Sequence, residues 1–279
     1  MSPLYELIVN VISMICILLT LAVYLYVRQL RNTLGKCVTC KLFCLFFCYL
    51  QSVSTYSEEV RLLPTYFQDF FVFCGIANET WNGVISYHLW KVFRPLGSPE
   101  SRHQFLMYNA FAWTSAATAT GLSIIERYFY WSTTVAVLNL VMVALWAILV
   151  FFNVVMFFLT TINIWKVKKE IKRFSENEDT PMACLSFDTQ TYLQFLRIFV
   201  MIGISWILRG VPYLMYFFNF YDFIVYCTNT LIQIFQLGFG IWVFVLLVVK
   251  RTTLQMLTDS IRERRNKRRI RAQRAKDLA

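Results

Sequence analysis

Four cysteines have the clearest chemical spacing in the sequence. Cys37, Cys40, Cys44 and Cys48 recur three or four residues apart, which places them on one face of a helix. A Cys-x-x-Cys pair can bind zinc or exchange a disulfide. No histidine or second Cys-x-x-Cys pair completes such a site, so we interpret the stripe as small apolar side chains that pack between helices.

A second group of residues is polar and lies within apolar stretches. Asn78, Glu79 and Asn82 fall near the middle of one stretch, and Arg209 falls near the middle of another. A charge at the centre of a membrane is costly unless it is neutralised or paired, so these residues are candidates for a ligand-binding or core polar site. Glu79 and Arg209 lie at similar depths on antiparallel helices and could pair. Alternatively, a protonated Glu79 would bond to Asn82 or Ser86, and Arg209 would extend outward.

Signatures of enzymes are missing from the sequence. His88 and His103 are its only histidines, and it has no zinc-protease motif, phosphate-binding loop or nucleophile elbow. We therefore expect no catalytic residue, no cofactor and no metal ion.

The composition indicates which elements hold these residues. Hydrophobic residues make up 58% of the 279 residues and charged residues only 15%, against about 25% in an average soluble domain. A membrane-spanning helix needs about 20 mainly apolar residues, and several stretches reach that length. The sequence predicts an all-α membrane protein, a bundle of seven transmembrane helices. The predicted spans cover about 4–27, 37–56, 66–93, 104–125, 136–165, 191–218 and 223–249.

Two of these spans have unusual features. Residues 128–165 carry no charge and contain no Gly or Pro that would turn them into a hairpin, so we predict one long fifth helix, followed by a charged loop over 166–190. Span six contains Gly203, Gly210 and Pro212, and proline kinks a helix because it removes a backbone hydrogen bond. This pattern predicts either a hinge or a static kink.

Residues 250–279 form a basic tail after the bundle of residues 1–249. Leu254, Leu257 and Ile261 recur at helical spacing, which predicts an amphipathic helix along the inner leaflet. Basic residues dominate the rest of the tail, and they would attract anionic inner-leaflet lipids of the bilayer. A segment that binds nucleic acid would look similar, but the seven spans favour the membrane and no nucleic acid.

The loops differ in their content of Lys and Arg. Of the 27 Lys and Arg residues, only Arg61 and Arg127 lie in loops that would be outside if the N-terminus were outside. Cytoplasmic loops of membrane proteins carry an excess of these residues. The sequence thus predicts a multi-pass protein of the plasma membrane, with its N-terminus outside and its C-terminus in the cytoplasm.

The order of several short motifs resembles that of a known family. Residues 30–37 and 42–47 resemble the first loop and second helix of insect Methuselah-like receptors, in the secretin/adhesion-like branch of G-protein-coupled receptors. The resemblance extends over all seven predicted spans. It continues at Trp81 and at residues 88–93, 108–113, 167–170, 195–197, 205–206 and 244–251.

The resemblance implies a receptor that signals by moving helix six and opening a cytoplasmic pocket for a heterotrimeric G protein. A peptide is one candidate ligand. In this sequence the implied coupling residues are basic: Arg94, Lys166, Lys168, Lys169, Lys172 and Arg197.

Departures from the family keep two other functions open. The sequence begins almost at the first span, so we expect a transmembrane region without the usual ectodomain. Such a protein could be a truncated, non-signalling receptor that forms a homo- or heterodimer and modulates a full-length relative. A transporter or channel could use Glu79 and Arg209 as a charge pathway, although no internal repeat or pair of broken helices supports it.

Overall fold

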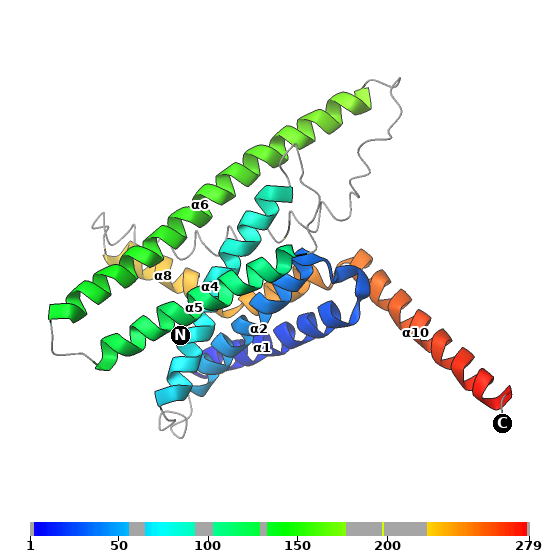
Figure 1. The fold of residues 1–279 in the computed structure, drawn as a ribbon, viewed down its shortest axis with the longest axis horizontal. Coiled ribbons are helices and arrows are strands. Elements are labelled where there is room, and N and C mark those ends of the chain that lie inside the picture. The colour runs from blue at the N-terminus through cyan, green and yellow to red at the C-terminus, as the bar shows by residue number, and fades with distance from the viewer. Residues whose placement is uncertain are drawn as a thin grey trace.

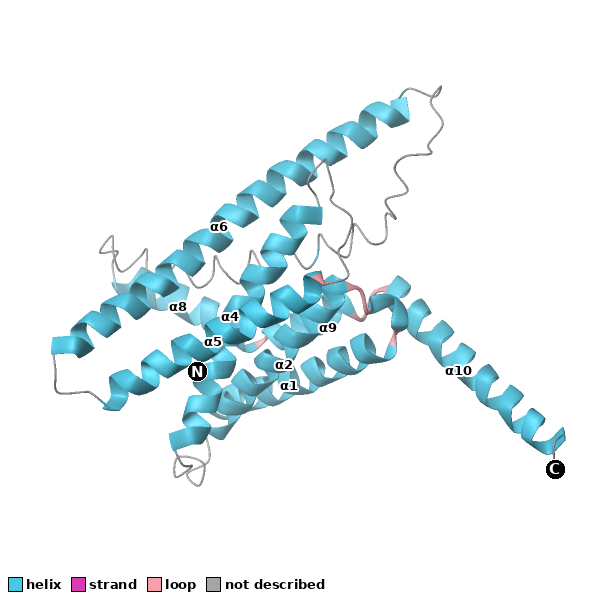
Figure 2. Ribbon diagram, in the orientation of Figure 1, coloured by secondary structure: helices cyan, strands magenta, loops and turns pink. Residues whose placement is uncertain are grey.

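Helices make up almost all of the described chain in the computed structural model, which covers residues 3–55, 65–92, 103–128, 133–176, 197 and 222–277 (Figures 1 and 2). No strand occurs in these ranges, so the all-α prediction is confirmed for them. The helices are α1 (Pro3–Tyr26), the short 3-10 helix η1 (Arg28–Leu30), α2 (Thr33–Ser54), α4 (Thr65–Val92), α5 (Gln104–Tyr128), α6 (Thr133–Glu176), α8 (Asp222–Leu237), α9 (Phe239–Leu247) and α10 (Arg251–Asp277).

Two described helices are long and apolar enough to cross a membrane by themselves. They are Leu4–Tyr26 within α1 and Thr33–Ser54, which is α2. A third candidate is the bent pair formed by α8 and α9, if the two helices make one span. Most of the predicted span six lies outside the described residues. Arg197 is the residue of this span that the structure describes.

Exposed and buried side chains are reversed on α1 compared with a soluble protein. Ile8, Ile15 and Leu25 are each about half exposed, whereas Asn10 and Ser13 are buried. Water-soluble monomers rarely expose continuous apolar surface of this kind. A hydrocarbon solvent accounts for the pattern, because there polar side chains find partners only inside the bundle.

The helix α6 is longer than predicted. It is continuous from Thr133 to Glu176, so the predicted charged loop over 166–190 is wrong for its first part. At about 1.5 Å per residue, such a helix is roughly twice as long as the ~30 Å hydrocarbon layer. Trp165 is exposed, and Lys169 Nζ lies 5.8 Å from the centre of its ring. Because tryptophan favours the membrane–water interface, the helix beyond Trp165 would extend into water.

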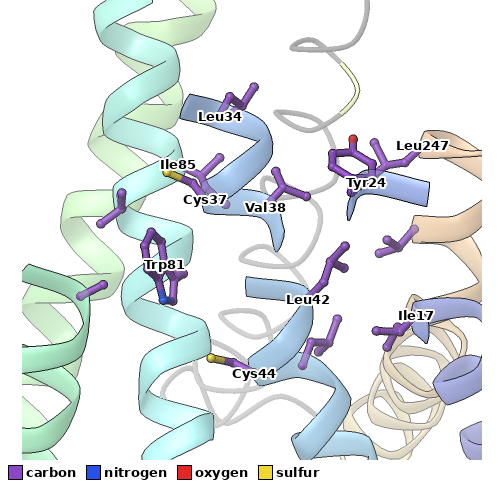
Figure 3. Close-up of a cluster of buried hydrophobic side chains, with 14 of the residues drawn as sticks. Ile17, Tyr24, Leu34, Cys37, Val38, Leu42, Cys44, Trp81, Ile85 and Leu247 are labelled. Atoms are coloured by element: carbon purple, nitrogen blue, oxygen red, sulfur yellow. The ribbon is translucent and has the colours of Figure 1, made fainter. Parts of the chain in front are cut away.

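Helix α4 lies at the centre of the bundle, since it packs against α2, α5 and α6 (Figure 1). Trp81 of α4 is completely buried, and its ring packs edge-on against Trp113 at 6.0 Å between ring centroids. On α2, Cys37 and Cys44 point toward α4 and are also completely buried (Figure 3). This is the packing role that the cysteine spacing predicts.

A tight connection joins α1 to α2. Asn32 caps α2, because its Oδ1 accepts a hydrogen bond from Gly35 N at 2.7 Å. A Cβ atom on Gly35 would lie only 1.7 Å from Leu30 O, so no larger residue fits there. The connection fixes the register between the first two helices, which form one wall of the cavity described below.

Candidate functional site

The polar group predicted on α4 forms a hydrogen-bonded cluster. Asn78 Nδ2 donates to Glu79 Oε1 at 3.0 Å, and Asn82 Nδ2 donates to Glu79 Oε2 at 3.3 Å. All three side chains are buried. The bond between Asn82 and Glu79 is one of the two suggested by the sequence, whereas Ser86 Oγ donates instead to Asn82 O. The two amides give each carboxylate oxygen a donor, which lowers the cost of burying Glu79.

A cavity of about 290 Å³ lies beside this cluster, between α1, α2, α4 and the α8–α9 pair. Its volume is at the small end of the range for ligand pockets, about 300–1,000 Å³. Acidic, basic and amide side chains line it together, including Glu6, Asn10, Lys41, Asn78, Asn82 and Gln233. The cavity could therefore hold a small polar group, with charged partners of both signs.

Lys41 is a cavity residue whose importance the sequence analysis missed. It is buried within the apolar helix α2, and its Nζ lies 5.5 Å from the centre of the Phe239 ring. A charged residue in a membrane span is by default a functional candidate. The signal was therefore present in the sequence, as a lysine surrounded by the apolar residues of span two.

The predicted span seven is not one straight helix. It breaks at Gly238, and its halves α8 and α9 meet at an angle of 50°. A helix break leaves backbone carbonyl groups without partners inside the helix. The sequence has no proline here, so it gave no sign of a break within the span predicted over 223–249.

Side chains from α1 and α2 satisfy the groups freed by the break. Ser13 Oγ donates to Leu237 O at 2.6 Å. The Tyr49 hydroxyl donates to Gln236 O at 2.7 Å and accepts from Gly240 N at 3.2 Å. These bonds hold the bend against the cavity wall. Sequence analysis missed Ser13 and Tyr49, because nothing local shows which distant backbone group a hydroxyl reaches.

Gly240 allows α9 to approach α1 closely. A Cβ atom at this position would lie 2.5 Å from Ser13 O and 2.8 Å from Ser13 Cβ. Both are shorter than real contacts of a Cβ atom, so a side chain would push the two helices apart. The close approach is what brings Ser13 within reach of the break.

At the opposite end of α9, Arg197 of the predicted span six contacts the predicted span seven. Arg197 Nη1 donates to Leu246 O at 3.1 Å. Lys166 and Lys169 are exposed on the part of α6 that follows Trp165, and Lys168 and Lys172 belong to the same segment. The structure does not join these lysines to Arg197 in one site within its described ranges.

Several predicted site residues lie outside the described residues. They are Arg94, Arg209, Gly203, Gly210 and Pro212. The pairing of Glu79 with Arg209, the hinge in span six and the contribution of Arg94 to a coupling surface therefore remain predictions.

The lipid-facing apolar surface, the buried polar cluster and the cavity together define a helical membrane protein with a polar interior. Comparison with known proteins identifies its relatives. The chain is 35% identical over 274 residues to the probable G-protein coupled receptor Mth-like 7 of Drosophila melanogaster, and 34% identical over 281 residues to Mth-like 12 of the same species. It is 32% identical over 284 residues to the G-protein coupled receptor Mth of Drosophila yakuba. The chain is thus a homologue of the Methuselah-like G-protein-coupled receptors.

These matches cover 90% to 94% of this chain but only 53% to 55% of each relative. The chain spans about half the length of the curated relatives it matches. No protein-family model matches it. The similarity confirms the resemblance seen in the motifs and identifies a membrane protein.

Proposed function

We propose that this chain is the seven-span region of a G-protein-coupled receptor in the plasma membrane, with its N-terminus outside and its C-terminus in the cytoplasm. It carries an extracellular signal to a heterotrimeric G protein. The similarity to receptors of that name over nine-tenths of the chain is the observation that supports this most strongly.

The signal enters at the polar cavity. Its residues Lys41, Asn78 and Asn82 are buried, so a ligand group there meets partners that water does not screen. Glu79 stands directly behind the two asparagines and would pair with Arg209 of span six. A ligand that changes this cluster changes the position of span six.

The signal leaves through the inner end of span six. Arg197 is bonded to Leu246 O, and an outward movement of span six must break this bond. A hydrogen bond from a charged group contributes about 1.5–3 kcal/mol. Removing this bond by substitution therefore shifts the equilibrium toward the open state by a factor of roughly 10 to 150. Gly203, Gly210 and Pro212 would be the hinge for the movement.

The coupling surface is basic and lies on the cytoplasmic side. It consists of Arg94 before α5 and of Lys166, Lys168, Lys169 and Lys172 on the end of α6, whereas Arg197 acts through its bond to Leu246 O. Cations there attract an acidic surface of a partner and increase its rate of association.

The test is activation of G proteins by the chain expressed alone in cells that lack related receptors. A variant with Arg94, Lys166, Lys168 and Lys169 changed to alanine should lose its basal activation at equal surface expression. Alanines at Arg61 and Arg127, on the predicted outer side, are the control and should leave activation unchanged.

A second variant tests the movement of span six. Arg197→Gln should raise basal activation, because the bond that holds the inner ends together is lost. If neither the parent nor this variant activates any class of G protein despite normal surface expression, the receptor proposal fails. That outcome would favour the modulator of a full-length relative.

A further inference from the structure

The inner end of α1 holds two arginines that come from different parts of the chain. Arg31 Nε donates to Leu25 O at 3.0 Å. Arg264 Nη2, from α10, donates to Tyr26 O at 3.4 Å, and its guanidinium lies 4.0 Å from the centre of the Tyr26 ring. The last carbonyls of a helix have no partner within it, so these contacts fix both cations at one helix end.

Two further cations lie at the same end. Arg28 belongs to η1, where its carbonyl accepts a hydrogen bond from Arg31 N at 3.1 Å. Lys267 Nζ pairs with Glu263 on α10. The pKa of the Glu263 carboxyl is lowered by Lys267 first, and Arg28 and Arg264 lower it further. Arg28, Arg31, Arg264 and Lys267, with Glu263, are called the α1-end cluster below.

The cluster is exposed and carries an excess of positive charge. Its four cations and one carboxylate leave a formal charge of +3. The side chain of Arg28 makes no hydrogen bond or ion pair with the part of the chain that the structure describes. A guanidinium has five N–H donors, so Arg31 and Arg264 keep donors free for a further anion after they bind the α1 carbonyls.

The surface next to the cluster is apolar. Leu18 and Leu25 lie seven residues apart on α1, so they fall on one face, and both are about half exposed. Because α1 is apolar and long enough to span a membrane, its last turn lies at the level of the lipid headgroups. A ligand of this surface must therefore combine acyl chains with an anionic headgroup.

We propose that the α1-end cluster binds an inner-leaflet phospholipid whose inositol headgroup carries several phosphates. Each phosphate accepts hydrogen bonds from the arginines in the planar, two-pronged geometry that guanidinium groups favour. The acyl chains lie along Leu18 and Leu25. The lipid joins the middle of the tail helix α10 to the end of α1. Helix α10 extends away from the bundle (Figure 1). The inner-leaflet location rests on the proposed orientation, but binding of the lipid does not.

The test uses the purified full chain in detergent micelles and dioctanoyl phosphatidylinositol bisphosphate as the probe. Affinity is measured by microscale thermophoresis, with dioctanoyl phosphatidylserine and free inositol trisphosphate for comparison. The cluster variant combines Arg28→Gln, Arg31→Gln and Arg264→Gln. Its matched control removes the same number of positive charges, all from the tail, by Arg269→Gln, Arg271→Gln and Arg274→Gln.

The cluster variant should bind the bisphosphate lipid at least about tenfold more weakly, and the control should change affinity less than about twofold. Arg28→Gln alone should weaken binding about fivefold without loss of folding, because Arg28 has no partner in the described fold. Equal losses of affinity in the two triple variants would show that the lipid responds to the overall positive charge of the chain and not to the cluster, and would overturn the proposal. So would equal affinity for phosphatidylserine, or binding of inositol trisphosphate as tight as that of the lipid.

These outcomes are separate from those of the receptor test. Lipid binding in micelles depends neither on coupling to a G protein nor on which end of the chain is outside. If the chain activates G proteins but does not bind the lipid at the cluster, only this inference is refuted. If it binds the lipid but activates no G protein, only the receptor proposal is refuted.

Discussion

Replacing Tyr49 by phenylalanine should destabilise the bend in span seven. The change removes one hydroxyl, which donates to Gln236 O at 2.7 Å and accepts from Gly240 N at 3.2 Å. A hydrogen bond contributes a net ~1 kcal/mol in soluble proteins, and bonds between membrane helices average ~0.6 kcal/mol and reach ~1.7. With two bonds lost and the ring retained, we expect the free energy of unfolding to fall by about 1–2 kcal/mol.

Thermal unfolding of the purified chain in nanodiscs measures this effect. For a chain of similar size, 1 kcal/mol changes the Tm by about 2–4 °C, so the Tm of Tyr49→Phe should fall by about 2–8 °C. Tyr87→Phe is the matched control, since Tyr87 is more than one-third exposed on α4 and contacts the described residues through its ring alone. It should leave the Tm unchanged.

The double variant with Ser13→Ala adds a second check. Ser13 Oγ bonds to Leu237 O, which lies 3.2 Å from the Tyr49 hydroxyl, so each hydroxyl can partly replace the other. The double variant should therefore lose at least ~0.5 kcal/mol more than the sum of the single variants. A Tm for Tyr49→Phe within 1 °C or so of the parent, together with simple additivity, would refute the argument that these side chains hold the bend.

Three further predictions concern the packing, the polar core and the topology. Gly240→Ala should lower the unfolding free energy by about 1–3 kcal/mol because its methyl group would collide with the backbone of α1, whereas Gly75→Ala, with open space around its Cβ, should be neutral in the same thermal assay. Glu79→Gln and Arg209→Gln should each reduce surface expression measured by flow cytometry, and the double variant should lose less than the sum; strictly additive losses would exclude the pairing. Epitope tags at the two ends, stained in intact and permeabilised cells, should place the N-terminal tag outside, and an N-terminal tag that needs permeabilisation would overturn the orientation.

The positions of the helices followed from the sequence where apolar stretches are long. The first two spans, predicted over 4–27 and 37–56, correspond to α1 and α2 within a few residues. The end of α6 was missed because the prediction ended the helix where the charges begin. A membrane boundary does not end a helix, and the Lys- and Glu-rich segment up to Glu176 consists largely of good helix formers.

The candidate site was accessible from the sequence only in part. A carboxylate in an apolar span indicated Glu79, and by the same reasoning Lys41 should have been included. The break at Gly238 was hidden, because its stability depends on partners far away in sequence. Tyr49 and Gln236 are 187 positions apart, and Ser13 and Leu237 are 224 apart. Local sequence patterns do not predict hydrogen bonds between residues so far apart, because these bonds depend on how the helices pack.

The bend in span seven also connects the cavity with the far end of α9. Phe239 opens α9 and faces Lys41 in the cavity, whereas Leu246 near the end of α9 accepts the bond from Arg197. A rigid helix passes a displacement at one end directly to the other. A few side-chain hydrogen bonds, each worth about 1 kcal/mol, add to the backbone bonds of Gly238 in holding the bend. A ligand with a few kcal/mol of differential affinity can therefore change the angle at Gly238 and the strength of the Arg197 contact without unfolding either helix.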